Sequence, residues 1–124
     1  MGLAAGFVWA IGAVICHQQA ARSFFIDGRQ LPVCARCTGL YASGAIAFAL
    51  WLVVRALRGR APIPMTSHSA VRAMAVAALP TAITWTTAAI GMWDGTNITR
   101  ALFAIPLGAA AGTIVAAVAT KDLR

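Results

Sequence analysis

The fold class of this chain is decided by the run ALFAIPLGAAAGTIVAAVAT, which occupies residues 101–120. The run carries no charge over twenty positions, and the charged segment Lys121-Asp122-Leu123-Arg124 follows it at once. A helix needs about 20 predominantly apolar residues to cross the hydrocarbon core of a bilayer. Because the run is apolar on every face, it is not the surface helix of a soluble domain. We therefore expect a membrane-spanning helix here.

Three further segments, working outward from this run, have a similar character. They cover residues 2–16, residues 38–54, which Arg55 closes, and residues 73–93, in which Pro80 predicts a kink. No basic residue precedes Cys16 and no small residue stands at Ile15, so we expect the first segment to be retained and not removed as a secretory signal. The sequence thus predicts an all-α integral membrane protein with four transmembrane helices, about residues 2–16, 38–54, 73–93 and 101–120, in a single transmembrane domain over residues 1–124.

The composition supports a membrane protein over a soluble one. Sixty per cent of the residues are hydrophobic, 10% are charged and the mean hydropathy is +0.80, whereas soluble domains carry about 25% charged residues. The net charge of +7 is typical of nucleic-acid-binding domains. Here, however, most basic residues lie in short polar segments between apolar runs, where membrane proteins contact lipid headgroups. We expect a lipid bilayer as the partner, and no nucleic acid.

Basic residues also predict the orientation, since cytoplasmic loops of membrane proteins carry an excess of Lys and Arg. With four spans, the two termini and the linker between the second and third helices share one side of the membrane. That side holds six basic residues, Arg55, Arg58, Arg60, Arg72, Lys121 and Arg124, and the opposite side holds four, Arg22, Arg29, Arg36 and Arg100. The sequence predicts a multi-pass protein of the cell membrane with cytoplasmic termini and a Cys/His loop on the outer face.

Two stretches have the spacing of small residues that lets membrane helices approach closely, Gly108-Ala-Ala-Ala-Gly112 and Gly2-Leu-Ala-Ala-Gly6. We interpret them first as packing within the chain. Contacts in a homo-oligomer or with another membrane protein are the second interpretation.

Chemistry-bearing residues gather in one polar segment, residues 16–41. All three cysteines, Cys16, Cys34 and Cys37, lie there, and an odd number cannot form a closed set of intramolecular disulfides. Asp27-Gly28 is a two-residue turn signal between residues 23–26 and residues 29–33. It predicts a short β-hairpin that brings Cys34 and Cys37 back to Cys16 and His17.

The first interpretation of this segment is a metal site. Cys16, His17, Cys34 and Cys37 form a Cys₃His set, a combination known from structural zinc sites, and we favour zinc over iron or copper. Cys34 and Cys37 have a Cys-x-x-Cys spacing that suits a metal knuckle. Cys16 and His17 are adjacent, and neighbours on a helix point about 100° apart. Both can bind one ion only if the helix ends between them.

Two other interpretations stay open. In a redox interpretation, Cys34 and Cys37 form a dithiol–disulfide pair, the following helix N-terminus and Arg36 lower a thiolate pKa, and Cys16 exchanges with the pair. A quinone is the candidate electron acceptor. In a structural interpretation, the cysteines are small buried apolar side chains and the hairpin is a lid.

Several polar residues are candidates for an anion or substrate site on the same face. Arg22 and Arg36 suit a lipid phosphate or a carboxylate, although basic side chains also extend to headgroups without a specific ligand. Asn97 and Arg100 follow in the second outer loop and would complete a polar wall, with Asp94 pairing with one of the arginines. A helix cap by Thr96 or Asn97 is the simpler role for that loop.

The segment resembles a known family. Cys16-His17-Gln18, Arg22-Ser23-Phe24-Phe25 and Leu31-Pro32-Val33-Cys34-Ala35-Arg36-Cys37-Thr38-Gly39-Leu40-Tyr41 are similar to the signature of a bacterial membrane family named domain of unknown function 2085. Thr96-Asn97, Arg100 and Gly108 resemble its last-loop pattern. The resemblance implies a multi-pass membrane topology and no specific activity. Ten residues of the candidate sites fall on motif positions: Cys16, His17, Arg22, Ser23, Cys34, Arg36, Cys37, Thr96, Asn97 and Arg100.

One stretch departs from the family pattern. Many members have an acidic residue, a Gly and a Gln shortly after the proline of the third helix, where this chain has Thr84-Trp85-Thr86-Thr87-Ala88. Our leading hypothesis is a multi-pass membrane protein with a zinc site near the outer interface. A membrane thiol–disulfide oxidoreductase, with a quinone or no cofactor, and a non-enzymatic membrane protein whose hairpin docks a partner are the alternatives.

Overall fold

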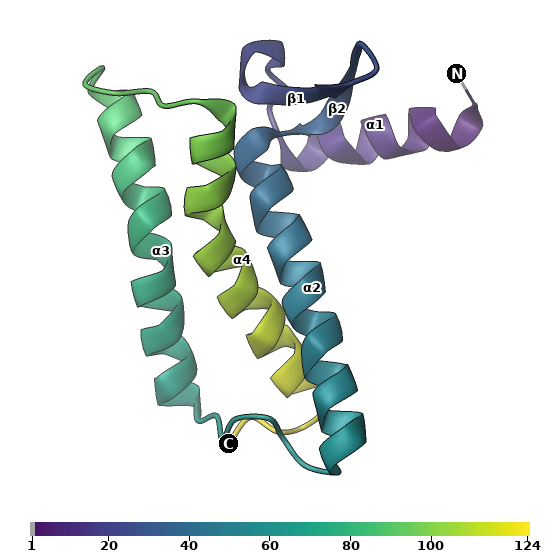
Figure 1. The fold of residues 1–124 in the computed structure, drawn as a ribbon, viewed down its shortest axis with the longest axis vertical. Helices are drawn as coiled ribbons and strands as arrows, with labels where there is room; N and C mark the ends of the chain where they lie inside the picture. Colours follow the sequence, from purple (N-terminus) through teal and green to yellow (C-terminus); the bar gives the residue numbers. More distant parts are fainter. Residues whose placement is uncertain (1) are drawn as a thin grey trace.

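The computed structural model describes residues 2–124, so that residue 1 of the predicted domain lies outside the described residues. Those residues form four α-helices, one short 3₁₀ helix and one β-hairpin. In Figure 1, α2, α3 and α4 lie side by side as a three-helix bundle, with the hairpin at one end. The elements in chain order are α1 (Leu3–Ile15), η1 (Ala20–Arg22), β1 (Ser23–Ile26), β2 (Arg29–Cys34), α2 (Ala35–Arg58), α3 (Ser67–Ala89) and α4 (Asn97–Ala119).

The closest helix packing in the bundle is between α2 and α4, and it depends on glycine. A Cβ added at Gly108 would collide with the carbonyl oxygen of Leu40, and one at Gly112 with the carbonyl oxygen of Gly44. The predicted role of the Gly108–Gly112 spacing in packing within the chain is therefore confirmed. At Gly2, the N-cap of α1, and at Gly6 within α1, by contrast, an added Cβ would meet open space.

The helices begin and end at capping residues, and these differ from the ends of the uncharged runs in the sequence. α3 begins six residues before the predicted residue 73, because Thr66 and Ser69 form a capping box. α4 begins at Asn97 because the Thr96 hydroxyl accepts the Thr99 N–H at 3.2 Å. α2 begins at Ala35, directly after the hairpin, and ends at Arg58, where Gly59 caps it in the left-handed conformation. The predicted cap at Thr96 is confirmed.

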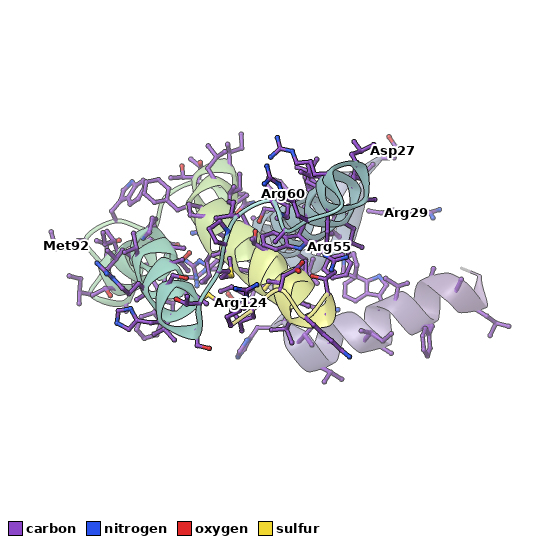
Figure 2. All side chains as sticks on the ribbon, turned by 90° about the horizontal axis from the view of Figure 1, so that it is seen from below. Asp27, Arg29, Arg55, Arg60, Met92 and Arg124 are labelled. Carbon is purple, nitrogen blue, oxygen red and sulfur yellow. The ribbon has the colours of Figure 1, made fainter. Side chains whose placement is uncertain are left out.

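The end of the bundle remote from the hairpin is closed by polar contacts with the segment after α4. Arg55 Nε donates to Asp122 Oδ2 at 2.6 Å, and Trp51 Nε1 donates to Thr120 Oγ1 at 3.3 Å. Leu123 forms an isolated parallel bridge with Met65, ahead of α3. Figure 2 views the bundle from below, with Arg55, Arg60 and Arg124 labelled. These contacts connect α2, the linker after it and the end of α4.

The helical fold and the hairpin are confirmed, whereas four membrane spans are not. Within residues 2–124, α2 and α4 are the helices long and apolar enough to cross a bilayer. α1 has 13 residues, which reach about 20 Å, short of the roughly 30 Å of hydrocarbon. Figures 1 and 2 both show α1 running sideways from the end of the bundle. α3 has 23 residues but is less apolar, with four threonines in its second half.

Candidate functional site

The hairpin forms as the sequence predicts, and it sets the position of Cys34. Asp27 and Gly28 have φ angles of 49° and 73°, the left-handed pair that a two-residue hairpin turn requires. Ile26 pairs with Arg29 next to the turn, and Ser23 pairs with Cys34 at the open end. The turn therefore returns the chain to the end of η1, where Cys34 becomes the N-cap of α2.

Cys16 is brought to the same place because α1 ends just before it. Its backbone is extended, with φ −148° and ψ 145°, and its Sγ accepts a hydrogen bond from the backbone N–H of Cys34 at 3.2 Å. Gln18 holds the junction from the other side: its Nε2 donates to the carbonyl oxygens of Pro32 at 2.8 Å and Trp9 at 3.0 Å. The chain leaving α1 is thus fixed against β2.

The three cysteine sulfurs form one cluster. The Sγ atoms of Cys16, Cys34 and Cys37 all lie within 4.8 Å of one another, and all three are free thiols. Cys16 is buried, while Cys34 and Cys37 are half-buried. The predicted approach of Cys16 to the Cys-x-x-Cys pair is what the coordinates show. We call these three residues the sulfur cluster.

The surroundings lower the pKa of Cys16, whereas burial above all raises the pKa of Cys37 to about 12. Burial also opposes ionisation of the Cys16 thiol, but hydrogen bonds from the backbone N–H groups of Cys34 and Gln18 and from the other two thiols outweigh it, so the pKa of Cys16 lies below its ordinary value. Thiolates are the form that binds metal ions and attacks disulfides.

His17 is the predicted ligand that the structure does not bring into the sulfur cluster. Its imidazole is exposed, although it lines the same cleft as the three sulfurs. α1 does end before Cys16, as a shared site would need, but the extended backbone at Cys16 sends neighbouring side chains to opposite sides. The structure therefore assembles three of the four predicted ligands.

The cleft over the sulfur cluster has a volume of about 380 Å³. Besides the cysteines and His17, it is lined by Trp85 of α3 and by three arginines, Arg22, Arg36 and Arg100. The arginines come from η1, α2 and α4, so that the cleft is built by elements distant in sequence. We call it the arginine cleft.

Asp94 joins two of these arginines. Its Oδ2 contacts Arg100 Nη2 at 2.7 Å, and its Oδ1 contacts Arg22 Nη2 at 3.3 Å. The hydrogen bond from Arg100 is the main cause that holds the pKa of Asp94 below its usual range. The positive charges of Arg100, Arg22 and Arg36 lower this pKa further. The predicted pairing of Asp94 is confirmed for Arg22 and Arg100.

Asn97 supports the site without lining it, because both the oxygen and the nitrogen of its side-chain amide form hydrogen bonds. Its Oδ1 accepts from Arg100 Nη1 at 2.9 Å, and its Nδ2 donates to the carbonyl oxygen of Ser23 at 3.0 Å. The side chain of Arg100 is only 9% exposed. Asn97 therefore positions Arg100 against the hairpin and is not among the residues that line the cleft.

A network of glutamines was missed by sequence reasoning. Gln30 Nε2 donates to the carbonyl oxygen of Gln18 at 2.8 Å and to Ser23 Oγ at 3.2 Å, and Ser23 Oγ donates to the carbonyl oxygen of Gln19 at 2.8 Å. Ser23 is 2% exposed. A signal was available, because uncharged polar residues in a segment next to a membrane must satisfy one another or reach water.

Arg36 is the remaining cation of the cleft. Within residues 2–124, its Nε atom is buried and has no hydrogen-bond partner. Arg36 lies between Cys34 and Cys37 in the first turn of α2.

Tyr41, one helical turn beyond Cys37, is 45% exposed. In the stretch that departs from the expected family pattern, Thr84 is buried and donates to the carbonyl oxygen of Thr81 at 2.9 Å.

Comparisons with known proteins agree with the resemblance seen in the motifs. The model of a family described as predicted membrane protein (DUF2085) matches residues 16–114, which include all three cysteines. An uncharacterized protein of Methanothermobacter thermautotrophicus is 32% identical over 110 residues, 89% of this chain and 87% of that protein. No solved structure matches the chain.

A second relative is longer than this chain. An uncharacterized protein of Methanocaldococcus jannaschii is 32% identical over 93 residues, which are 75% of this chain and 56% of that protein. The chain thus spans little more than half the length of this relative.

Proposed function

Since this chain belongs to the DUF2085 family of predicted membrane proteins, we propose that it is a multi-pass membrane protein whose sulfur cluster holds one zinc ion at the outer end of its helix bundle. The observation that carries the proposal is the mutual approach, within 4.8 Å, of three sulfurs from two segments of the chain. Two sulfurs bound to one tetrahedral zinc ion lie about 3.8 Å apart, given Zn–S bonds of about 2.3 Å. A small closure of the cluster would therefore suffice.

In this proposal α2, α3 and α4 all cross the bilayer. The threonines of α3 are compatible with a membrane interior because their hydroxyls donate to backbone carbonyls: Thr84 to Thr81, Thr86 to Ala82 and Thr87 to Ile83, each at 2.8–2.9 Å. Thr81 Oγ1 donates across to the carbonyl oxygen of Phe103 at 2.9 Å and so joins α3 to α4. These contacts satisfy the polar groups without water.

α1 is then an interfacial helix on the side of the sulfur cluster, in place of the predicted first span. Its large apolar side chains are exposed, Leu3 by 97%, Phe7 by 69% and Val14 by 85%. Such a surface needs lipid. The six basic residues at the far end and in the C-terminal segment support a cytoplasmic position for that end. The sulfur cluster and α1 accordingly share the outer interface.

The fourth zinc ligand is His17 in this proposal. His17 already lines the cleft over the sulfurs, and a structural zinc site is four-coordinate. Because the side chain is exposed, its movement toward an ion, together with the backbone next to Cys16, would not disturb packing.

Zinc content and ligand type test the proposal. Full-length protein purified in detergent, without chelator or reductant, should contain about one zinc per chain. X-ray absorption should show three sulfur neighbours and one nitrogen. His17→Ala should remove the nitrogen signal, whereas His68→Ala at the opposite end should leave the spectrum unchanged. Metal-free protein that is folded and carries three reactive thiols would overturn the proposal.

A second candidate function is that of a thiol–disulfide oxidoreductase in which a membrane quinone oxidises the Cys34–Cys37 dithiol. It is favoured by the position of Cys34 at the N-cap of α2, with Cys37 one turn later and Cys16 in contact with both. In that reaction a Cys34–Cys37 disulfide forms while two electrons and two protons pass to a quinone in the membrane. Purified protein would then contain little metal and a disulfide that mild reductant opens. Slow alkylation that chelator accelerates supports zinc instead.

A further inference from the structure

We propose that the arginine cleft binds the phosphate group of a phosphorylated molecule, directly beside the sulfur cluster. This inference rests on the proposed function in one respect: the metal site forms one wall of the phosphate site. The class of ligand follows from the arginines and not from the metal. A free phosphate and the phosphate of a lipid headgroup share this chemistry.

The charge in the cleft is positive whether or not the sulfurs hold a metal. Arg22, Arg36 and Arg100 contribute three positive charges and Asp94 one negative charge. A zinc ion with three thiolates adds a further net negative charge, and three neutral thiols add none. The chain has only two other carboxylate side chains, Asp27 at the tip of the hairpin and Asp122, which contacts Arg55. An anion is the natural partner for the excess charge.

Arg100 is built into the site before any ligand arrives. Its side chain is 9% exposed and is held by Asp94 at 2.7 Å and by Asn97 at 2.9 Å. Asn97 is fixed in turn by the carbonyl oxygen of Ser23 at 3.0 Å. A guanidinium carries five N–H donors, so two such contacts leave donors available. A fixed arginine loses little freedom when it binds a ligand.

Arg36 has a side-chain nitrogen that lacks a hydrogen-bond acceptor within residues 2–124. Its Nε is buried without a hydrogen bond among the described residues, and Arg36 is one of the residues that line the cleft. A buried guanidinium nitrogen is normally hydrogen-bonded. The N-terminus of α2 beside it has no side-chain cap, and helix N-termini favour oxyanions. Both features are explained by an oxyanion between Arg36 and the start of α2.

The number of arginines selects phosphate over carboxylate. Each guanidinium can form two parallel hydrogen bonds to an oxyanion. Even with one nitrogen each of Arg22 and Arg100 turned to Asp94, the three arginines retain more N–H donors than the two oxygens of one carboxylate accept, whereas a phosphate offers three or four oxygens in a tetrahedral array. The cleft volume of about 380 Å³ accommodates a phosphate group with part of the molecule that carries it.

The test measures phosphate binding to the full chain by calorimetry in a detergent without phosphate, with sodium acetate as the comparison anion. Phosphate should bind at least tenfold more tightly than acetate. Arg36→Gln should weaken phosphate binding at least tenfold, and Arg36→Lys, which keeps the charge but not the fork, should weaken it less. Arg58→Gln, at the opposite end of the bundle, is the matched control and should change nothing. Circular dichroism verifies that each variant is folded.

A second arm identifies the source of the phosphate. Native mass spectrometry of protein from nanodiscs of phosphatidylglycerol should show a retained lipid if the ligand is a headgroup, and Arg36→Gln should lose it. Tight inorganic phosphate binding without a retained lipid indicates a free phosphate compound. Equal affinity for acetate and phosphate, or no binding of either phosphate source to folded protein, overturns the inference.

The zinc proposal and the phosphate proposal can be contradicted independently of each other. Phosphate binding that survives in protein shown to be zinc-free supports the anion site and contradicts the zinc site. Zinc-loaded protein that binds no phosphate does the opposite.

Discussion

The backbone N–H of Cys34 donates to the Cys16 sulfur at 3.2 Å, across eighteen positions of sequence. This bond connects the residue that follows α1 with the residue that precedes α2. The same amide therefore favours a thiolate at Cys16 and fixes the open end of the hairpin. The same hydrogen bond thus contributes both to the closed hairpin and to the position of Cys16 in the sulfur cluster.

Replacing Cys16 by Ser should weaken zinc binding by more than about 100-fold, because altering groups that only support metal ligands already costs about 10- to 100-fold. Zinc competition with a chromophoric chelator measures the affinity. If Cys34 and Cys37 instead act as a redox pair, the variant should stay stably folded and accumulate mixed disulfides, which would contradict the metal site.

The hairpin turn should control the metal site from a distance. Gly28 has a φ of 73°, which an alanine adopts at a cost of about 1–2 kcal/mol. Gly28→Ala should lower the melting temperature and weaken zinc affinity, since Cys34 is held by the strand that the turn returns. Asp27→Asn keeps a residue that tolerates the left-handed conformation and should leave both quantities unchanged. Unaltered zinc affinity in folded Gly28→Ala would separate the turn from the site.

Helix packing should be far more sensitive at Gly112 than at Gly6. Gly112→Ala places a methyl group against the carbonyl oxygen of Gly44, and overpacking of this kind costs about 1–3 kcal/mol. Gly6→Ala points into open space and should be neutral or slightly stabilising. Thermal unfolding in one detergent compares the two. Equal melting temperatures would contradict the close approach of α2 and α4.

Acid should weaken the link between Asp94 and its arginines. The pKa of Asp94 is lowered in the folded protein, chiefly by the hydrogen bond from Arg100. Its stabilising effect is therefore fully present above the ordinary value of 3.8 and is lost as the pH falls through the lower, folded-state pKa. Asp94→Asn should melt earlier than the unmodified protein at neutral pH, and the two melting temperatures should converge in strong acid. A gap that stays constant from neutral pH into strong acid would rule out this linkage.

Membrane orientation can be tested with single cysteines introduced at Arg29 and Arg58 in a background where the native cysteines are replaced by alanine. A membrane-impermeant thiol reagent should label position 29 in intact cells and position 58 only after permeabilisation. The reverse pattern would invert the proposed topology, and labelling of both in intact cells would exclude a bundle that crosses the membrane.

Local signals in the sequence were sufficient for the hairpin and the sulfur cluster. Asp27-Gly28 specifies its turn through backbone conformations that few residues adopt, and a turn of known length determines which residues face each other. The Thr96 cap and the Gly108–Gly112 contact also depend on near neighbours or on a simple spacing.

Two features were not accessible from pattern alone. The direction of α1 depends on the extended residue Cys16 and on Gln18, whose φ is 47°, and apolar composition does not encode that bend. The failure of His17 to join the sulfurs has the same origin. The burial of Arg36 Nε depends on how η1, α2 and α4 meet, which no spacing within one segment reveals.

Because Cys16 directly follows the last residue of α1, a small rotation of the chain at Cys16 would move the far end of this helix. α1 is about 20 Å long, so a rotation of about 10° at its attached end displaces its far end by roughly 3 Å. Because Cys16 lies immediately after Ile15, a group bound at the sulfurs would lie at the attached end of α1, and in the proposed interfacial position it would control how deeply the far end enters the bilayer.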